Sequence, residues 1–124
     1  MAALCEKMNR SEALEKINYS LSTEEARVIT PKGEIYEDYV KKLSNILISS
    51  VIVPVKVNVT STCVIEGEYN VYKNAVVWAI AINNGNWLLT LEKENEFALG
   101  FGDDPSNIKM HGFSSSDALG EWCA

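Results

Sequence analysis

One long block of strand-forming residues, Val51 to Phe101, dominates this chain, with helical patterns before and after it. The block opens with valine at every second position from Val51 to Val59, a period of two that is typical of a strand with one buried face. Pro54 interrupts the pattern. Because proline cannot donate to a ladder, it indicates an edge strand or a bulge. The middle of the chain is therefore predicted to form a sheet.

A second strand is predicted to begin at Cys63 to Ile65, where Gly67 indicates a bulge or a turn. The chain is expected to continue as strand through Tyr69, Val71 and Tyr72. The pattern leaves open whether this is one bent strand or two. A thiol at Cys63 would then be packed in the sheet.

The clearest strand is Ala75 to Ile82, which is nearly continuous in apolar residues, as expected of a central strand covered on both faces. Asn84-Gly85 supplies the two residues that a type I′ hairpin favours, so Trp87 to Leu91 is the predicted return strand. A second turn at Glu92 to Asn95 leads to a strand from Glu96 to Phe101. These strands together form an antiparallel meander.

Two helices are predicted before the sheet. Asn9 caps the first, with Glu12 at the capping-box position. The second runs roughly from Glu34 to Ser49. Between them, Arg27 to Thr30 reads either as the end of a short helical turn or as a strand. The apolar faces predicted for the two helices are Ala13, Leu14, Ile17 and Leu21, and Ile35, Tyr39, Leu43, Ile46 and Leu47.

A short C-terminal helix is predicted from a capping box formed by Ser114 and Asp117, with Ala118, Leu119 and Trp122 packing onto the sheet. The chain of 124 residues has the common size of one domain, and its 47% apolar content is ordinary for a globular protein. We therefore predict a single α+β domain over residues 1–124. It contains an antiparallel meander sheet of four to six strands, with two N-terminal helices and one short C-terminal helix packed on one face.

The charge of the chain limits its partners. Seventeen acidic against eleven basic residues give a net charge of -6, which repels phosphate backbones and attracts cationic surfaces. A basic protein is the expected partner, and direct binding of nucleic acid is not expected. No stretch approaches the ~20 apolar residues of a membrane helix, and the N-terminal residues lack the apolar run of a secretory signal. We expect a cytoplasmic protein that does not bind membranes, with three reduced cysteines.

Catalytic and cofactor motifs are missing from the sequence. The single histidine, His111, reads as a loop residue, and no nucleophile motif surrounds any serine or cysteine. Asp103-Asp104 lacks the spacing of a calcium loop, and Gly100-Phe101-Gly102 lacks the rest of a phosphate-binding motif. We predict no catalytic residue, no metal site and no cofactor, and hence a protein that is not an enzyme.

Acidic residues gather at the second turn of the meander and its flanks. In a meander every second turn lies at the same end of the sheet, so the region of Glu66 to Tyr69 is expected beside this turn. Carboxylates with tyrosines nearby suit a partner rich in lysine or arginine, with charge setting the association rate and the aromatic rings anchoring the contact. The predicted partner-binding residues are Glu66, Glu68, Tyr69, Tyr72, Glu92, Glu94 and Glu96.

In size, acidity and shortage of catalytic groups the chain resembles bacterial immunity proteins, the small acidic partners that block a toxin's active site. The resemblance implies an inhibitor that neutralises a basic protein, for example a toxin, by occluding a cleft or mimicking a substrate's negative charge.

Two alternatives stay open. The first is a small-molecule-binding or enzymatic α+β domain with a pocket between the sheet and the 34–49 helix, lined by Tyr36, Tyr39 and Trp78. The second is a homo-oligomeric structural domain, such as a homodimer, that pairs through a strand edge or an apolar helix face.

Overall fold

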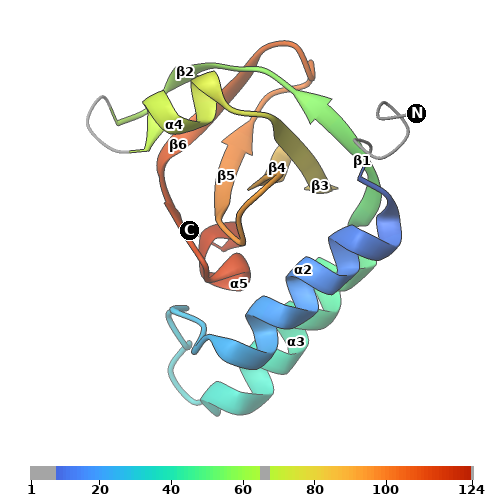
Figure 1. Ribbon diagram of the computed structural model, residues 1–124. Coiled ribbons are helices and arrows are strands. Elements are labelled where there is room, and N and C mark those ends of the chain that lie inside the picture. The colour runs from blue at the N-terminus through green and yellow to red at the C-terminus, as the bar shows by residue number, and fades with distance from the viewer. Residues whose placement is uncertain (1–7, 65–67, 124) are drawn as a thin grey trace.

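The computed structural model describes residues 8–64 and 68–123, and it confirms an α+β fold with a mostly antiparallel sheet (Figure 1). Over this part of the chain there are four helices and six strands. The helices are α2 (Arg10–Thr23), α3 (Tyr36–Ser49), α4 (Tyr69–Asn74) and α5 (Ala118–Trp122). The strands are β1 (Val51–Val57), β2 (Val59–Thr62), β3 (Val77–Asn83), β4 (Asn86–Leu91), β5 (Phe97–Phe101) and β6 (Ile108–Ser115).

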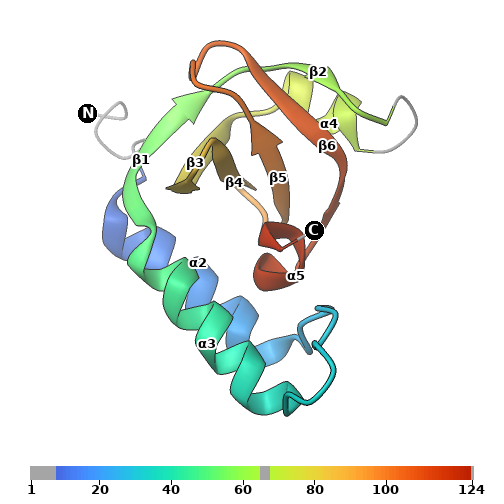
Figure 2. The same ribbon diagram turned by 180° about the vertical axis from the view of Figure 1, so that it is seen from behind.

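The sheet has the order β1-β3-β4-β5-β6-β2. Strands β3 to β6 follow one another as antiparallel neighbours, but β2 pairs in parallel with β6, which the predicted meander did not include. Only Asn58 separates β1 from β2, so one short segment supplies both outer strands. The Asn58 N–H donates to the Pro105 carbonyl (2.8 Å), and the Asn58 carbonyl accepts from the Ile108 N–H (2.9 Å). The sheet therefore curls strongly, as Figure 2 shows from behind.

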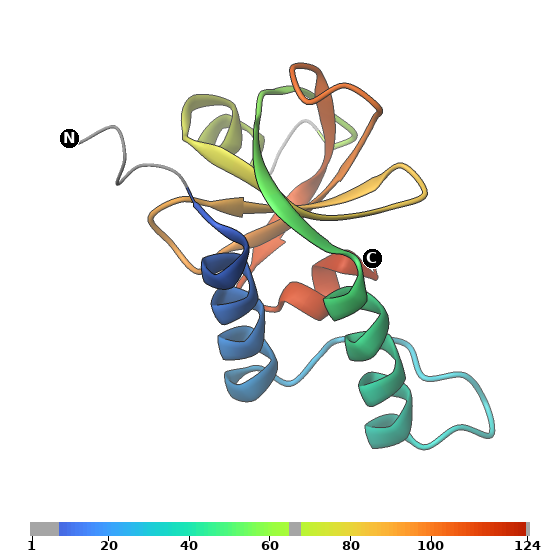
Figure 3. The same cartoon turned by 90° about the vertical axis from the view of Figure 1, so that its right-hand side faces the viewer.

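Both faces of the sheet are buried. Consecutive residues of β3 alternate between two apolar clusters, with Trp78 and Ile80 in one and Val77 and Ala79 in the other. Helices α2, α3 and α5 cover the first cluster, and Figure 3 shows α2 and α3 side by side with α5 close to the strands. Helix α4 contacts β2 and β6 and belongs to the second cluster through Tyr72. The three helices that correspond to the predicted ones thus cover one cluster, and α4, which was not predicted, belongs to the other.

Local signals placed the first helix and the first hairpin. The Asn9 side chain accepts from the Glu12 N–H and the Glu12 carboxylate accepts from the Asn9 N–H, both at 2.9 Å, which confirms the capping box. Asn84 and Gly85 have φ angles of 52° and 79°, as a type I′ turn requires. Helix α3 begins without a side-chain cap, close to its predicted start. Ile35 and Ile46, predicted to face the core, are exposed.

Strand β1 confirms the interpretation of Pro54 but not the alternation of the valines. The strand is at the edge of the sheet, and its register with β3 shifts between Val51 and Val55. Because of this shift Pro54 is buried and Val53 is 69% exposed. A bulge exchanges the faces of the residues that follow it.

The predicted strand through Tyr69, Val71 and Tyr72 is wrong, since these residues form helix α4. The buried Tyr72 side chain anchors this six-residue helix, and the Glu68 N–H donates to the Gly112 carbonyl (2.9 Å) just before it. Cys63 follows the end of β2 and is exposed, so the prediction of a packed thiol is also wrong. The predicted bulge or turn at Gly67 lies outside the described residues.

Residues 27–30 are neither helix nor strand. Their backbone is held instead by Asp117, whose carboxylate accepts from the Arg27 N–H (2.8 Å). Asp117 also caps α5 by accepting from the Gly120 N–H (2.8 Å), whereas Ser114, the predicted cap, lies in β6. His111 is in β6 as well and not in a loop. None of the described helices has the length and apolar character needed to cross a membrane.

Candidate functional site

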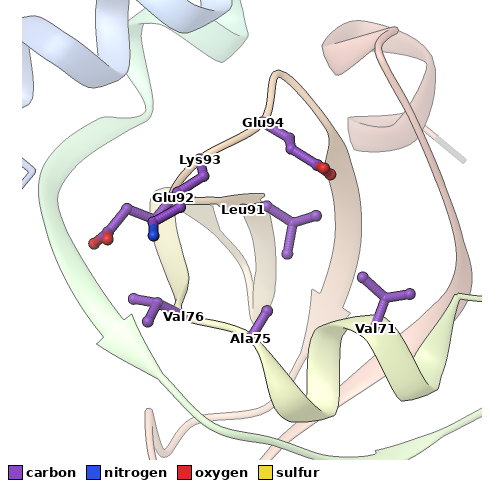
Figure 4. A pocket seen from close by; sticks show the side chains of 7 residues that line it. All are labelled: Val71, Ala75, Val76, Leu91, Glu92, Lys93 and Glu94. Atoms are coloured by element: carbon purple, nitrogen blue, oxygen red, sulfur yellow. The ribbon is translucent and has the colours of Figure 1, made fainter.

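Two of the predicted contact residues, Glu92 and Glu94, line an open pocket of about 310 Å³ between α4 and the turn after β4 (Figure 4). We call this pocket the mouth. It is lined by Val71, Ala75 and Val76, from α4 and the residues after it, and by Leu91, Glu92, Lys93 and Glu94, from the end of β4 and its turn. Val71 and Val76 are 48% and 39% exposed, which is high for apolar side chains of this size. The mouth therefore presents apolar surface beside two carboxylates.

Backbone and lysine contacts hold the turn of the mouth in place. The Glu92 N–H donates to the Val76 carbonyl (3.1 Å), which joins the turn to the segment after α4. From the other side, the Lys16 Nζ of α2 donates to the carbonyls of Leu91 (3.1 Å) and Glu94 (2.8 Å). Burial lowers the pKa of Lys16. The turn is thus fixed by α2 and by the segment between α4 and β3.

The two carboxylates of the mouth differ in their partners. The Glu92 carboxylate accepts from the Trp78 Nε1–H (3.1 Å). The Glu94 side chain makes no hydrogen bond or ion pair with any residue in the described ranges, and Figure 4 shows it facing the same opening as Leu91. Glu94 is therefore the carboxylate of the mouth that is open to an external cation.

Tyr72 and Glu96, also predicted as contacts, point elsewhere. Tyr72 is 1% exposed and belongs to the core, so it cannot touch a partner in this conformation. Burial, helped by the negative charges of Glu96, Glu121 and Glu68, raises the pKa of Tyr72, while Ser114 opposes the shift. The Glu96 carboxylate accepts from the Ser114 hydroxyl (3.3 Å). Tyr72 therefore packs inside the protein, and the half-buried Glu96 carboxylate already has a partner.

The remaining predicted contacts belong to α4 and the residues before it. Glu68 is exposed at the start of the helix, and the ring of Tyr69 lies 5.7 Å from the Lys73 Nζ. Glu66 lies outside the described residues. Glu92 and Glu94 thus line one pocket, whereas Tyr69 lies in the first turn of α4 and Glu68 just before it, and neither of these two lines that pocket.

The apolar part of the mouth was not predicted from the sequence. Val71 was assigned to a strand, and Ala75 and Val76 to the start of the central strand, where they would be buried. The structure begins that strand at Val77 and leaves both residues exposed. The apolar run from Ala75 to Ile82 carries no signal that its first two residues lie outside the strand.

A second pocket, of about 200 Å³, is lined by Arg27, His111, Phe113, Gly120 and Glu121. The Glu121 carboxylate accepts from the Ser115 hydroxyl (2.8 Å), and burial raises its pKa. No cysteine lines this pocket, so it does not pair His111 with a thiol. Among the residues that the structure describes, no group of three or more acidic, histidine or cysteine side chains could hold a metal ion.

The small-molecule pocket predicted from Tyr36, Tyr39 and Trp78 does not form with that lining. Tyr36 lines a pocket of about 210 Å³ between α2 and α3, and its hydroxyl donates to the Ala26 carbonyl (2.7 Å). Tyr39 and Trp78 do not line it, and Trp78 is buried in the core as predicted. Trp87 is buried as well, and its Nε1–H donates to the Gly102 carbonyl (2.6 Å).

No protein-family model matches the chain, and neither a curated protein nor a solved structure is significantly similar to it.

Proposed function

We propose that this protein is a binding module that neutralises a basic protein by covering part of its surface, as inhibitors and immunity proteins do. The observation that carries the proposal is the mouth, where exposed Val71 and Val76 lie beside Glu92 and Glu94. Protein interfaces commonly combine an apolar centre with a polar rim. The net charge of -6 would speed the approach of a cationic partner.

Affinity capture at low salt with matched baits tests the proposal. The test bait carries Glu92→Gln and Glu94→Gln; glutamine at position 92 keeps an oxygen that accepts from Trp78 Nε1. The control bait carries Glu37→Gln and Asp38→Asn, which remove the same charge from exposed positions in the first turn of α3. We expect the wild-type and control baits to retain a basic protein that the test bait loses.

With the purified partner, the association rate of the wild-type protein should fall as salt rises, because salt screens the attraction between exposed charges. The test variant should associate more slowly and with a weaker dependence on salt. Equal retention and equal rates for the test and control variants would remove the proposal.

A small-molecule function is the second candidate, since the mouth has an apolar lining and a volume of about 310 Å³. This volume is at the lower end of the ~300–1,000 Å³ typical of ligand sites. It suits a single side chain or a fragment better than a cofactor.

A further inference from the structure

The mouth combines an apolar lining with one carboxylate, that of Glu94, which has no partner among the described residues. Val71, Ala75 and Leu91 face an opening at which the Glu94 carboxylate also lies (Figure 4). An apolar occupant would remove this carboxylate from water without offering it a partner, and burying an unpaired charge is costly. The occupant that suits both features has an aliphatic body and a positive end.

The cations already present near the mouth do not fill this role. The Lys16 Nζ lies against the backbone carbonyls of Leu91 and Glu94 and the side chain of Asn95. Lys93 is exposed on the rim and forms no ion pair within 4 Å with another described residue. The Glu92 carboxylate already accepts from Trp78. Glu94 is therefore left to pair with a cation from outside.

We propose that the mouth receives one long cationic side chain, a lysine or an arginine, of the partner protein. Its methylene groups pack against Val71, Ala75 and Leu91, and its charged end pairs with Glu94. Lysine and arginine commonly bury their stems along apolar surface while the charged head stays at the rim. This inference rests on the proposed function and names the chemical group that the function recognises.

Titration of the full chain with three six-carbon probes, followed by amide NMR, tests the inference. The probes are n-hexylammonium, n-hexanol and hexanoate. We expect n-hexylammonium to bind most tightly and hexanoate most weakly, with shift changes concentrated at residues 71–76 and 91–94. Glu94→Gln should weaken n-hexylammonium binding about two- to fivefold, the range expected for an exposed ion pair.

Three further variants sharpen the test. Lys93→Gln removes a repelling charge from the rim and should strengthen n-hexylammonium binding. Ala75→Leu places a larger side chain in the mouth and should abolish the shifts of all three probes while the remaining amide signals stay folded. Glu37→Gln, at an exposed site outside the mouth, should leave the affinity unchanged.

Equal affinities for n-hexylammonium and n-hexanol, with no effect of Glu94→Gln, would overturn the inference and favour an apolar ligand. The inference would also fail if no probe bound while retention of the partner in the capture experiment still required Glu92 and Glu94. The proposed function would then stand. The opposite result, cation-selective binding of the probes without any partner lost from the test bait, would support the chemistry of the mouth and overturn the protein-binding function.

Discussion

At the scale of single residues, Gly112 and Gly85 share a positive φ but differ in their surroundings. Gly112 has φ 124°, and a Cβ added there would lie 2.7 Å from the Val64 Cβ. Gly85 has φ 79°, and a Cβ there would meet no atom within 4 Å. Gly112 is therefore needed both for its positive φ and because a side chain would collide with Val64, whereas Gly85 is needed only for its positive φ.

We expect Gly112→Ala to lower the free energy of unfolding by clearly more than Gly85→Ala. The Gly85 variant bears mainly the left-handed strain of a non-glycine residue, about 1–2 kcal/mol. The Gly112 variant must also push β6 away from Val64. Urea titration of both variants measures the difference, and equal losses would contradict the close approach of these two segments.

Glu121 gives the protein a predicted dependence of stability on pH. Burial raises the pKa of this carboxyl above its ordinary value of 4.5. Between the ordinary and the raised pKa the folded chain binds the proton more readily than the unfolded chain, so stability falls as the pH rises through the folded pKa.

Glu121→Gln removes the buried negative charge and should raise the free energy of unfolding at neutral pH. The gain over wild type should shrink as the pH falls and should vanish below the ordinary value, where both side chains are neutral. Denaturant titrations from about pH 3 to about pH 8 measure this difference. Glu94→Gln, at an exposed site, is the control; a gain that stayed constant with pH would speak against this role of burial.

Some residue roles could be predicted and others could not. Asn9 and the Asn84-Gly85 pair were predicted because their structure depends on residues within a few positions along the chain. Gly112 and Tyr72 were not, because their conformation and burial depend on contacts with distant segments. Glu92 and Glu94 were placed on the correct turn, but what they face depends on α4.

At the scale of secondary structure, β1 shows how one bulge overrides a regular pattern. The valines alternate without a break, yet the register shift between Val51 and Val55 leaves Val53 exposed and Val57 buried. The spacing of apolar residues predicts which face of the sheet each side chain lies on only where no bulge interrupts the strand.

Paired threonine substitutions in β1 check this arrangement. Val53→Thr should change the free energy of unfolding by less than about 0.5 kcal/mol, since the site is at the surface. Val57→Thr should cost about 1–3 kcal/mol, because it buries a hydroxyl group in an apolar cluster. Chemical denaturation of the two variants decides between this strand and one with all its valines inward, for which the two costs would be similar.

Helix α4 and strand β6 were not predicted from the sequence. Residues 69–72 include two tyrosines and a valine, which favour strands, and no side chain caps α4. Burial of Tyr72 and the contacts of α4 with β2 and β6 decide its structure. In β6, Gly112 and the serines at 114 and 115 made the segment look like a loop. In both cases tertiary contacts outweigh local preference.

At the scale of the whole molecule, the link at Asn58 joins the two sides of the curled sheet. The segment that pairs with β3 continues directly into the segment that pairs with β6. Detaching one side therefore strains the other, and the two sides should open together.

Hydrogen exchange at low urea concentrations measures this coupling. The amide of Val57, where β1 pairs with β3, and the amide of Ile108, which donates to Asn58, should show opening free energies that converge as urea is added. A lower and urea-insensitive opening energy at one of the two amides would show that the sides separate independently.

The two outer strands of the sheet also affect the tendency of the protein to aggregate at high concentration. Exposed strand edges are where chains add to one another and begin to aggregate. Here β1 carries Pro54 and an irregular register, and β2 is four residues long. Neither offers an incoming chain a long, regular row of unpaired backbone groups, so this protein should resist growth into fibres even at high concentration.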